Sequence, residues 1–282
     1  MRSIVKSFIQ WASSLALFLA ITAVNAQTIH VSHCMAGCPE SNSSSGASGN
    51  EIVVRHLFAA SINGENGLAD WVAYRVLADT VGVASLLPRF WYEDNLLTSL
   101  ANVDQIIDGA SQIFQPDLTG RADRSYRINE IIISTEDQGR LAPMSSFAGT
   151  PYWSELNYIS NLAALPNDLR VGSWARLDQA VNELAAREGE IFVVSGPLYR
   201  IQNVLNTRPD NMTDKPSAFF KVIATESNLA AFIFPYGIAQ HANYCDQLNS
   251  LESIEQESGL TVFPEKQAVG DASLQASLGC KN

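Results

Sequence analysis

The order of its apolar segments most constrains what this chain can fold into. One amphipathic helix is predicted at Ser173–Gly189, with strand-like segments before and after it. Its apolar positions recur at spacings of three and four residues: Trp174, Leu177, Val181 and Leu184. The glycine at its end is typical of a helix C-terminus. A second helix is expected at Leu248–Glu257, ended by Gly259.

Other segments are rich in β-branched and aromatic residues and are predicted to be strands. They are Glu51–Ala60, Asp70–Ala78, Glu130–Thr135, Ile191–Tyr199, Ala218–Ala224, Leu229–Phe234 and Thr261–Pro264. Strands and helices do not alternate regularly, as they would in a parallel βαβ fold. The order therefore predicts a single α+β domain, with a mostly antiparallel sheet flanked by helices.

The N-terminus has the pattern of a signal peptide. Arg2 and Lys6 precede the apolar run Trp11–Val24, which is shorter than the roughly 20 residues of a membrane span. Small residues follow at Val24-Asn25-Ala26. We expect a signal peptide at residues 1–26, a mature domain at 27–282, and a secreted or periplasmic location. The alternative is an uncleaved anchor helix. No other segment is long and apolar enough for a span, so the mature chain is not expected to enter a membrane.

The mature chain is acidic. The formal net charge is −11 for the whole chain, and losing Arg2 and Lys6 with the signal peptide makes it −13. Proteins that bind nucleic acid usually carry a basic patch. Bulk charge therefore gives no long-range attraction for polyanions, although it is compatible with a local cationic site.

The four cysteines of an exported chain favour two disulfides. Three connectivities are open, and adjacent pairing, Cys34–Cys38 with Cys245–Cys280, is the simplest. The second bridge would close a loop of the unfolded chain and so stabilise the fold by roughly 3–4 kcal/mol by the chain-entropy estimate. The alternative for the first pair is a metal site with His30 or His33. Its place near a frayed terminus in an oxidising compartment argues against that.

The most informative polar pattern lies in the stretch Asp137–Asp178. Arg170, Asp178 and Asn182 stand at multiples of four residues. If the helix extends back to Arg170, these three side chains lie along one of its faces. Arg140 can reach that face only through tertiary folding.

Short motifs along nearly the whole mature chain carry a resemblance. They are HCMAGC, VVRH at 53–56, DWVAY at 70–74, LNYISN at 156–161, GSWARL at 172–177, SGPLY at 195–199, PSAFFKVI at 216–223 and GCKN at the C-terminus. Together they resemble the DNA/RNA non-specific endonuclease family, the ββα-metal or His-Me finger nucleases, and within it the secreted Serratia-type nucleases. The resemblance implies phosphodiester hydrolysis of DNA or RNA, Mg²⁺ as cofactor, a homodimer, and the disulfide pairing Cys34–Cys38 with Cys245–Cys280.

The resemblance also assigns roles to positions. In the family, the histidine of a D-R-G-H motif removes a proton from water, and the asparagine of L-N-x-G-x-W binds Mg²⁺. Here Asp137 and Gly139 match the first motif, but Gln138 replaces its arginine and Arg140 its histidine. Arg170 occupies the metal-ligand position.

Four further positions complete the implied site. Asp178 stands at a glutamate that supports the metal-bound water, and Asn182 replaces an arginine one turn further on. Asn161 matches a second family asparagine, and Arg89 matches a phosphate-contacting arginine. Arg89 also stands beside three aromatic residues, so stacking on Trp91 is an alternative for it.

The two arginine replacements predict impaired catalysis and no bound cofactor, with Mg²⁺ expected only if the family activity survives. Arginine does not deprotonate in proteins, so Arg140 cannot act as a general base. It offers no lone pair to a metal, so Arg170 cannot be the ligand. Loss of a general base alone costs about 10²- to 10⁴-fold in rate. Arg89, Arg140 and Arg170 could instead form a cationic site for phosphate, because guanidinium groups match phosphate geometry.

Two other functions stay open from sequence alone. The chain could be an active nuclease with a different base; the remaining histidines are His30, His33, His56 and His241. Of these, His56 is expected to be a packed or hydrogen-bonded strand residue. The chain could also be a non-catalytic protein-interaction module, with Arg170 merely paired to Asp168 or Asp178.

Overall fold

The computed structural model describes most of the chain beyond residue 30. The described ranges are 31–42, 50–64, 67–89, 91–97, 126–128, 131–133, 138–199, 216–265, 269–270 and 272–281. The signal-peptide boundary, His30 and Asp137 lie outside them. Within the described part, no helix is long and apolar enough to cross a membrane.

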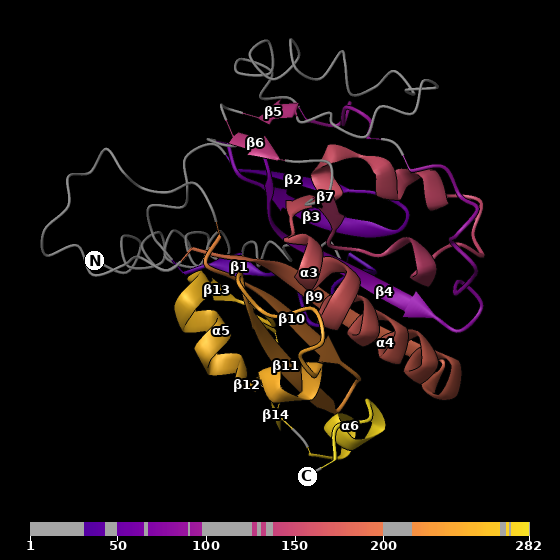
Figure 1. Cartoon of the computed structure of the whole chain (residues 1–282), viewed down its shortest axis with the longest axis vertical. Helices are drawn as coiled ribbons and strands as arrows, with labels where there is room; N and C mark the ends of the chain where they lie inside the picture. Colours follow the sequence, from indigo (N-terminus) through magenta and orange to yellow (C-terminus); the bar gives the residue numbers. More distant parts are fainter. Residues whose placement is uncertain are drawn as a thin grey trace, which may run out of the picture. The chain divides into compact units, whose positions relative to one another are not determined.

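An eight-stranded sheet forms the centre of the domain (Figure 1). Its order is β12-β11-β10-β9-β4-β3-β2, with β14 paired to β11. The strands are β2 (Glu51–Val54), β3 (Phe58–Ile62), β4 (Ala69–Leu77), β9 (Glu190–Leu198), β10 (Ala218–Ala224), β11 (Asn228–Pro235), β12 (Leu248–Asn249) and β14 (Val269–Gly270). Every pairing in the order is antiparallel except that of β14. The predicted α+β class with a mostly antiparallel sheet is confirmed.

Both faces of the sheet are buried, and different helices cover them. On β4, Val72 belongs to one core and Trp71 to the other, as the period of two in a strand requires. Helix α4 (Ala175–Glu188) packs into the Val72 core, and α5 (Leu251–Ser258) packs into the Trp71 core. Each fully buried aliphatic side chain contributes about 1.5–3 kcal/mol. The apolar face of α4, with Leu177, Val181, Leu184 and Ala185 in the Val72 core, fixes this helix against the sheet.

Short elements connect these layers. They are β1 (Glu40–Ser41), β5 (Tyr126–Ile128), β6 (Ile131–Ile133), β7 (Gln138–Arg140), η3 (Met144–Ser146), η4 (Trp153–Asn157), η5 (Ile159–Asn161), β8 (Leu162–Ala164), α3 (Asn167–Leu169), η6 (Arg170–Trp174), η8 (Tyr244–Gln247), β13 (Leu260–Thr261) and α6 (Ala272–Ser277). Three two-stranded pairs lie outside the main sheet: β1 with β13, β5 with β6, and β7 with β8. The last pair carries the candidate site.

Several local predictions are confirmed. The disulfides Cys34–Cys38 and Cys245–Cys280 form as expected. Helix α4 ends at Gly189, whose φ is 90°, and α5 ends at Gly259, whose φ is 69°. Both values lie in the region that glycine adopts at little cost.

The single strand predicted at Glu51–Ala60 is wrong. The chain turns between β2 and β3, where the backbone N–H of Arg55 donates to the carbonyl of Phe58 at 2.8 Å. In this turn Arg55 contacts Asp94 and His56 contacts Glu155. These partners are distant in the sequence, so the apolar pattern of the segment cannot indicate the turn. His56 is therefore an exposed turn residue and not a packed strand residue, but it is hydrogen-bonded, as the other alternative predicted, through Nδ1 to Glu155 Oε1.

Two boundaries near the C-terminus also differ from prediction. The helix expected from Leu248 begins only at Leu251, because Ser250 caps it by accepting a hydrogen bond from the Ser253 N–H at 3.1 Å. Leu248 pairs with β11 instead. The strand expected at Thr261–Pro264 is reduced to β13, since only Leu260 and Thr261 pair with β1.

Candidate functional site

Strand β7 presents Gln138 and Arg140 to the indole ring of Trp91. Side chains two apart on a strand point to the same face. The Trp91 Nε1–H donates to Gln138 Oε1 at 2.9 Å, and the Arg140 guanidinium lies 4.3 Å from the centroid of an indole ring. The glycine between them is required, because a Cβ on Gly139 would lie 2.3 Å from Leu165 Cδ1. The cation that stacks on Trp91 is thus Arg140.

Two oxygen acceptors fix the edge of the Arg140 guanidinium. Its Nε donates to the Leu156 carbonyl at 3.2 Å, and its Nη2 donates to Asn157 Oδ1 at 2.5 Å. Arg140 is half-buried, and Asn157 is fully buried. The guanidinium is therefore held on both its flat face and its edge, in a defined orientation. Sequence reasoning missed Asn157, since the motif LNYISN contains it without marking its contact.

Asn157 also holds the segment of Arg89 near the Arg140 guanidinium. Asn157 Nδ2 donates to the carbonyl of Pro88 at 3.2 Å. Arg89 follows directly in the chain and is exposed. The structure thus brings the neighbourhoods of two predicted arginines together, Arg89 and Arg140, through one buried amide.

Asn161 supports the backbone around the site. It is fully buried, and its Nδ2 donates to the carbonyls of Ala142 and Leu156, each at 3.0 Å. Its Oδ1 accepts from the Ala142 N–H at 2.7 Å. Because Leu156 O also accepts from Arg140, Asn161 positions the loop that holds the guanidinium.

The helix does not extend back to Arg170 as the spacing had suggested. Gly172 interrupts it with φ −97° and ψ −117°, and a Cβ there would lie 2.4 Å from the Gln240 carbonyl oxygen. This close backbone contact, possible only for glycine, produces the wide turn η6. Arg170 precedes the break, is half-buried, and donates from Nη2 to Asn167 Oδ1 at 2.8 Å. The expected common face holds only for Asp178 and Asn182.

Asp178 forms a buried ion pair with Lys221 of β10. Lys221 is 0% exposed, and its ammonium also lies 3.9 Å from the centroid of a ring of Trp174. Burial lowers the pKa of Lys221 and raises the pKa of Asp178, and the pairing opposes both shifts. Burial also raises the pKa of Tyr74, and the charge of Asp178 adds to that rise. The carboxylate is thus committed to Lys221 inside the protein, and the suggested pairing of Arg170 with Asp178 is not formed.

Asn182 ties α4 to η3. Its Oδ1 accepts from Ser146 Oγ at 2.6 Å, and its Nδ2 donates to Ser145 Oγ at 3.2 Å. It is buried, as Asp178 is one turn earlier. Both residues on this helix face therefore bind neighbouring side chains of the protein.

The residues at the implied metal position do not fit a magnesium ion. Mg²⁺ prefers oxygen ligands and retains water. At the ligand position that the resemblance implies, Arg170 offers only a cationic group, and the carboxylate of Asp178 already binds an ammonium. The part of the chain that the structure describes contains no cluster of three or more His, Cys, Asp or Glu side chains arranged for a metal.

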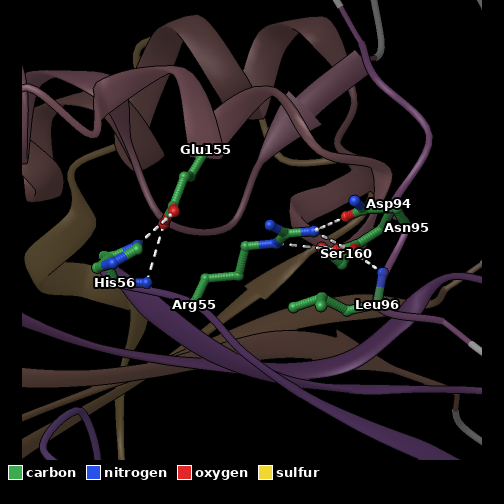
Figure 2. Close-up of polar contacts among 7 residues, drawn as sticks. All are labelled: Arg55, His56, Asp94, Asn95, Leu96, Glu155 and Ser160. Atoms are coloured by element: carbon green, nitrogen blue, oxygen red, sulfur yellow. Dashed lines mark hydrogen bonds and ion pairs between the residues drawn. The ribbon is translucent and has the colours of Figure 1, made fainter.

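The described histidines differ in environment. His33 is buried, its Nε2 contacts the Arg55 carbonyl at 2.8 Å, and burial lowers its pKa. His241 is exposed. His56 has a side chain that is 62% exposed, and its Nδ1 lies 2.6 Å from Glu155 Oε1. Figure 2 shows His56 and Glu155 pointing toward each other.

Arg55 points the other way, into a separate network (Figure 2). It forms an ion pair with the buried Asp94, which also accepts from Ser160. The guanidinium lies 3.7 Å from the centroid of the Tyr158 ring. Sequence reasoning missed this pair, because its members are far apart in the chain. It anchors the Trp91–Asp94 segment that lies under Arg140.

The comparisons with known proteins agree with this architecture. The family model for the DNA/RNA non-specific endonuclease matches residues 39–269. A nuclease of Serratia marcescens is 29% identical over 284 residues, which cover 95% of this chain and 97% of that protein. The chain therefore belongs to the DNA/RNA non-specific endonuclease family, which is metal-dependent.

More distant relatives share part of the chain or the fold. The mouse protein Nuclease EXOG, mitochondrial, is 27% identical over 57% of this chain and 50% of its own length. A crystal structure of an EndoG/EndoGI complex superposes with a TM-score of 0.56 at 17% identity, over 78% of this chain and 89% of that chain. This likeness shows the ββα-metal nuclease fold.

Proposed function

We propose that this chain is a nuclease-family protein that binds the phosphates of DNA or RNA but hydrolyses them poorly. The observation that carries the proposal is Arg140. A guanidinium stands where the family has its base, and Trp91 and Asn157 hold it in one orientation. Arginine matches phosphate oxygens with paired N–H groups. A pre-oriented guanidinium loses little conformational entropy on binding.

Hydrolysis is proposed to be weak for two chemical reasons. Arg140 keeps its proton at all working pH values, so it cannot activate water. Asp178, at the position of the supporting carboxylate, is buried against Lys221. Its negative charge is thus compensated inside the protein. Loss of the general base alone should lower the rate of hydrolysis by about 10²- to 10⁴-fold.

The electrostatics predict local and salt-sensitive binding. The mature chain carries a formal charge of −13 when Arg2 and Lys6 are removed from the total of −11. We therefore attribute the attraction to the local cations Arg89 and Arg140, which Asn157 brings together, with Arg170 as a further candidate, and not to the net charge of the molecule. Each phosphate contact on a single strand contributes about −0.7 to the slope of log K against log salt.

The test is fluorescence anisotropy with labelled DNA and RNA oligonucleotides at increasing salt. Arg140→Ala should weaken binding and make the salt slope less negative by about 0.7. Arg187→Ala is the matched control: it removes the same charge from the end of α4, where Arg187 contacts the Ser277 carbonyl. No binding at low salt would contradict the proposal and favour a protein-interaction module. Cleavage by the parent across pH 5–9 would favour an active nuclease with another base.

We also propose that residues 1–26 are a signal peptide and that the domain 27–282 is secreted or periplasmic. The two disulfides support this, because disulfides persist in oxidising compartments. N-terminal sequencing of the exported protein should begin at Gln27. The homodimer implied by the resemblance is likewise a proposal, and sedimentation equilibrium of the mature domain tests it.

A further inference from the structure

The two ends of the short helix η4 present different surfaces. Asn157, at its C-terminal end, holds the guanidinium of Arg140. Tyr152, which precedes its first residue, stacks on His56 with ring centroids 4.1 Å apart and planes 6° apart. Tyr152 is 45% exposed, and the His56 side chain is 62% exposed. An ordered and exposed aromatic pair thus lies on the same element as the proposed phosphate site.

Glu155 fixes this aromatic pair. Its Oε2 accepts the backbone N–H of His56 at 2.9 Å, and its Oε1 lies 2.6 Å from His56 Nδ1 (Figure 2). The Glu155 side chain is only 13% exposed, so its charge is turned toward the imidazole and away from solvent. The ring plane of His56 is therefore set before any ligand arrives.

The spacing connects the pair to Arg140. A 3₁₀ helix rises about 2.0 Å per residue, so Tyr152 and Asn157 lie about 10 Å apart along the axis of η4. A short single strand of nucleic acid can span this distance, with a phosphate at one end and a base at the other. Proteins that bind single strands combine cationic groups for the backbone with aromatic rings for the bases.

We propose that the His56–Tyr152 stack is a binding subsite for a nucleobase of single-stranded DNA or RNA. The base adds to the stack beyond its exposed face, next to the phosphate bound at Arg140. Every base has a π-face, so the subsite is tolerant of sequence. This inference rests on the proposed function and names the part of a substrate that the protein contacts outside the phosphate.

The experiment compares variants of Tyr152 by anisotropy with labelled oligothymidine and oligouridine. Stacking is worth about 1–3 kcal/mol per base, so Tyr152→Ala should weaken binding about 5- to 150-fold. Tyr152→Phe, which keeps the ring, should bind within about twofold of the parent. A single strand of the same length without bases should bind the parent and Tyr152→Ala equally.

A second pair of variants tests the subsite if Tyr152→Ala does not fold. If Tyr152→Ala fails to fold by near-UV circular dichroism, His56→Ala and His56→Phe take its place. The alanine should weaken binding and the phenylalanine should retain it. Equal affinity of parent and alanine variants for the single strand, with Arg140→Ala still weakened, would overturn the subsite and leave the proposed function intact. A parent that binds no oligonucleotide at low salt would defeat the proposed function itself.

Discussion

The two arms of the candidate site, Arg140 and Asp178, differ in their electrostatic surroundings. At Arg140, a half-buried cation lies on Trp91 and is held by the neutral oxygens of Leu156 and Asn157. At Asp178, a carboxylate lies buried against the ammonium of Lys221. The first arm orients a charge that suits a phosphate. In the second arm, the protein itself neutralises the charge, so the loss of either partner alone should destabilise the fold.

The largest effect should come from breaking the buried arm. Lys221→Met leaves the Asp178 carboxylate buried without its cation, and removing one partner of a buried pair costs about 3–5 kcal/mol. Urea unfolding of parent and variant measures this loss. The double variant Lys221→Met with Asp178→Leu should recover most of it, because both charges are gone. A Lys221→Met protein as stable as the parent would show that the pair is not structural.

The Arg140 arm should respond in affinity as well as in stability. Arg140→Ala removes one charge-assisted contact to phosphate, worth about 1.5–3 kcal/mol, or about 10- to 150-fold in affinity. Its unfolding free energy should fall by about 1–3 kcal/mol, less than in Lys221→Met, because the change removes the stacking on Trp91 and leaves the buried Asn157 Oδ1 without its donor. Anisotropy and urea unfolding on the same sample separate the two quantities. A large loss of stability with unchanged affinity would reverse the assignment of the two arms.

The smallest effect is a pH dependence of stability through His33. Its pKa is lowered by burial from the ordinary 6.5, so below that pH the unfolded state binds the proton first. His33 therefore leaves stability unaffected above pH 6.5 and reduces it as the pH falls toward its lowered folded value. His33→Gln should flatten this part of the plot of unfolding free energy against pH, with each free energy measured by urea unfolding at steps from pH 7 to 5. If the slope of unfolding free energy against pH is the same in His33→Gln as in the parent, other groups cause the pH dependence.

Much of the fold could be predicted from sequence because it depends on local patterns. The strands of the central sheet follow β-branched and aromatic runs, and α4 and α5 end at glycines as expected. The turn between β2 and β3 could not be predicted. Apolar residues flank Arg55 and His56 on both sides, and the partners of these two residues, Asp94 and Glu155, come from elsewhere in the chain.

The sequence proposes the candidate site as a set of positions and could not give its contacts. The family motifs nominate Arg140, Arg170 and Asp178 as site residues, and this assignment stays a prediction. They could not show that Gly172 separates Arg170 from the helix, since this depends on the approach of the Gln240 backbone. The motif PSAFFKVI contains Lys221 but does not indicate that this residue pairs with Asp178, 43 residues earlier in the sequence.

The most direct measurement of the central claim is nucleic-acid cleavage by a revertant beside the parent. The revertant carries Gln138→Arg, Arg140→His and Arg170→Asn, which restore the family residues at the base and ligand positions. Plasmid DNA and RNA are incubated with each protein and Mg²⁺, after anisotropy has confirmed that the parent binds. We predict that the parent binds without appreciable cleavage and that the revertant cleaves. A parent that degrades both substrates as fast as the revertant would contradict the account.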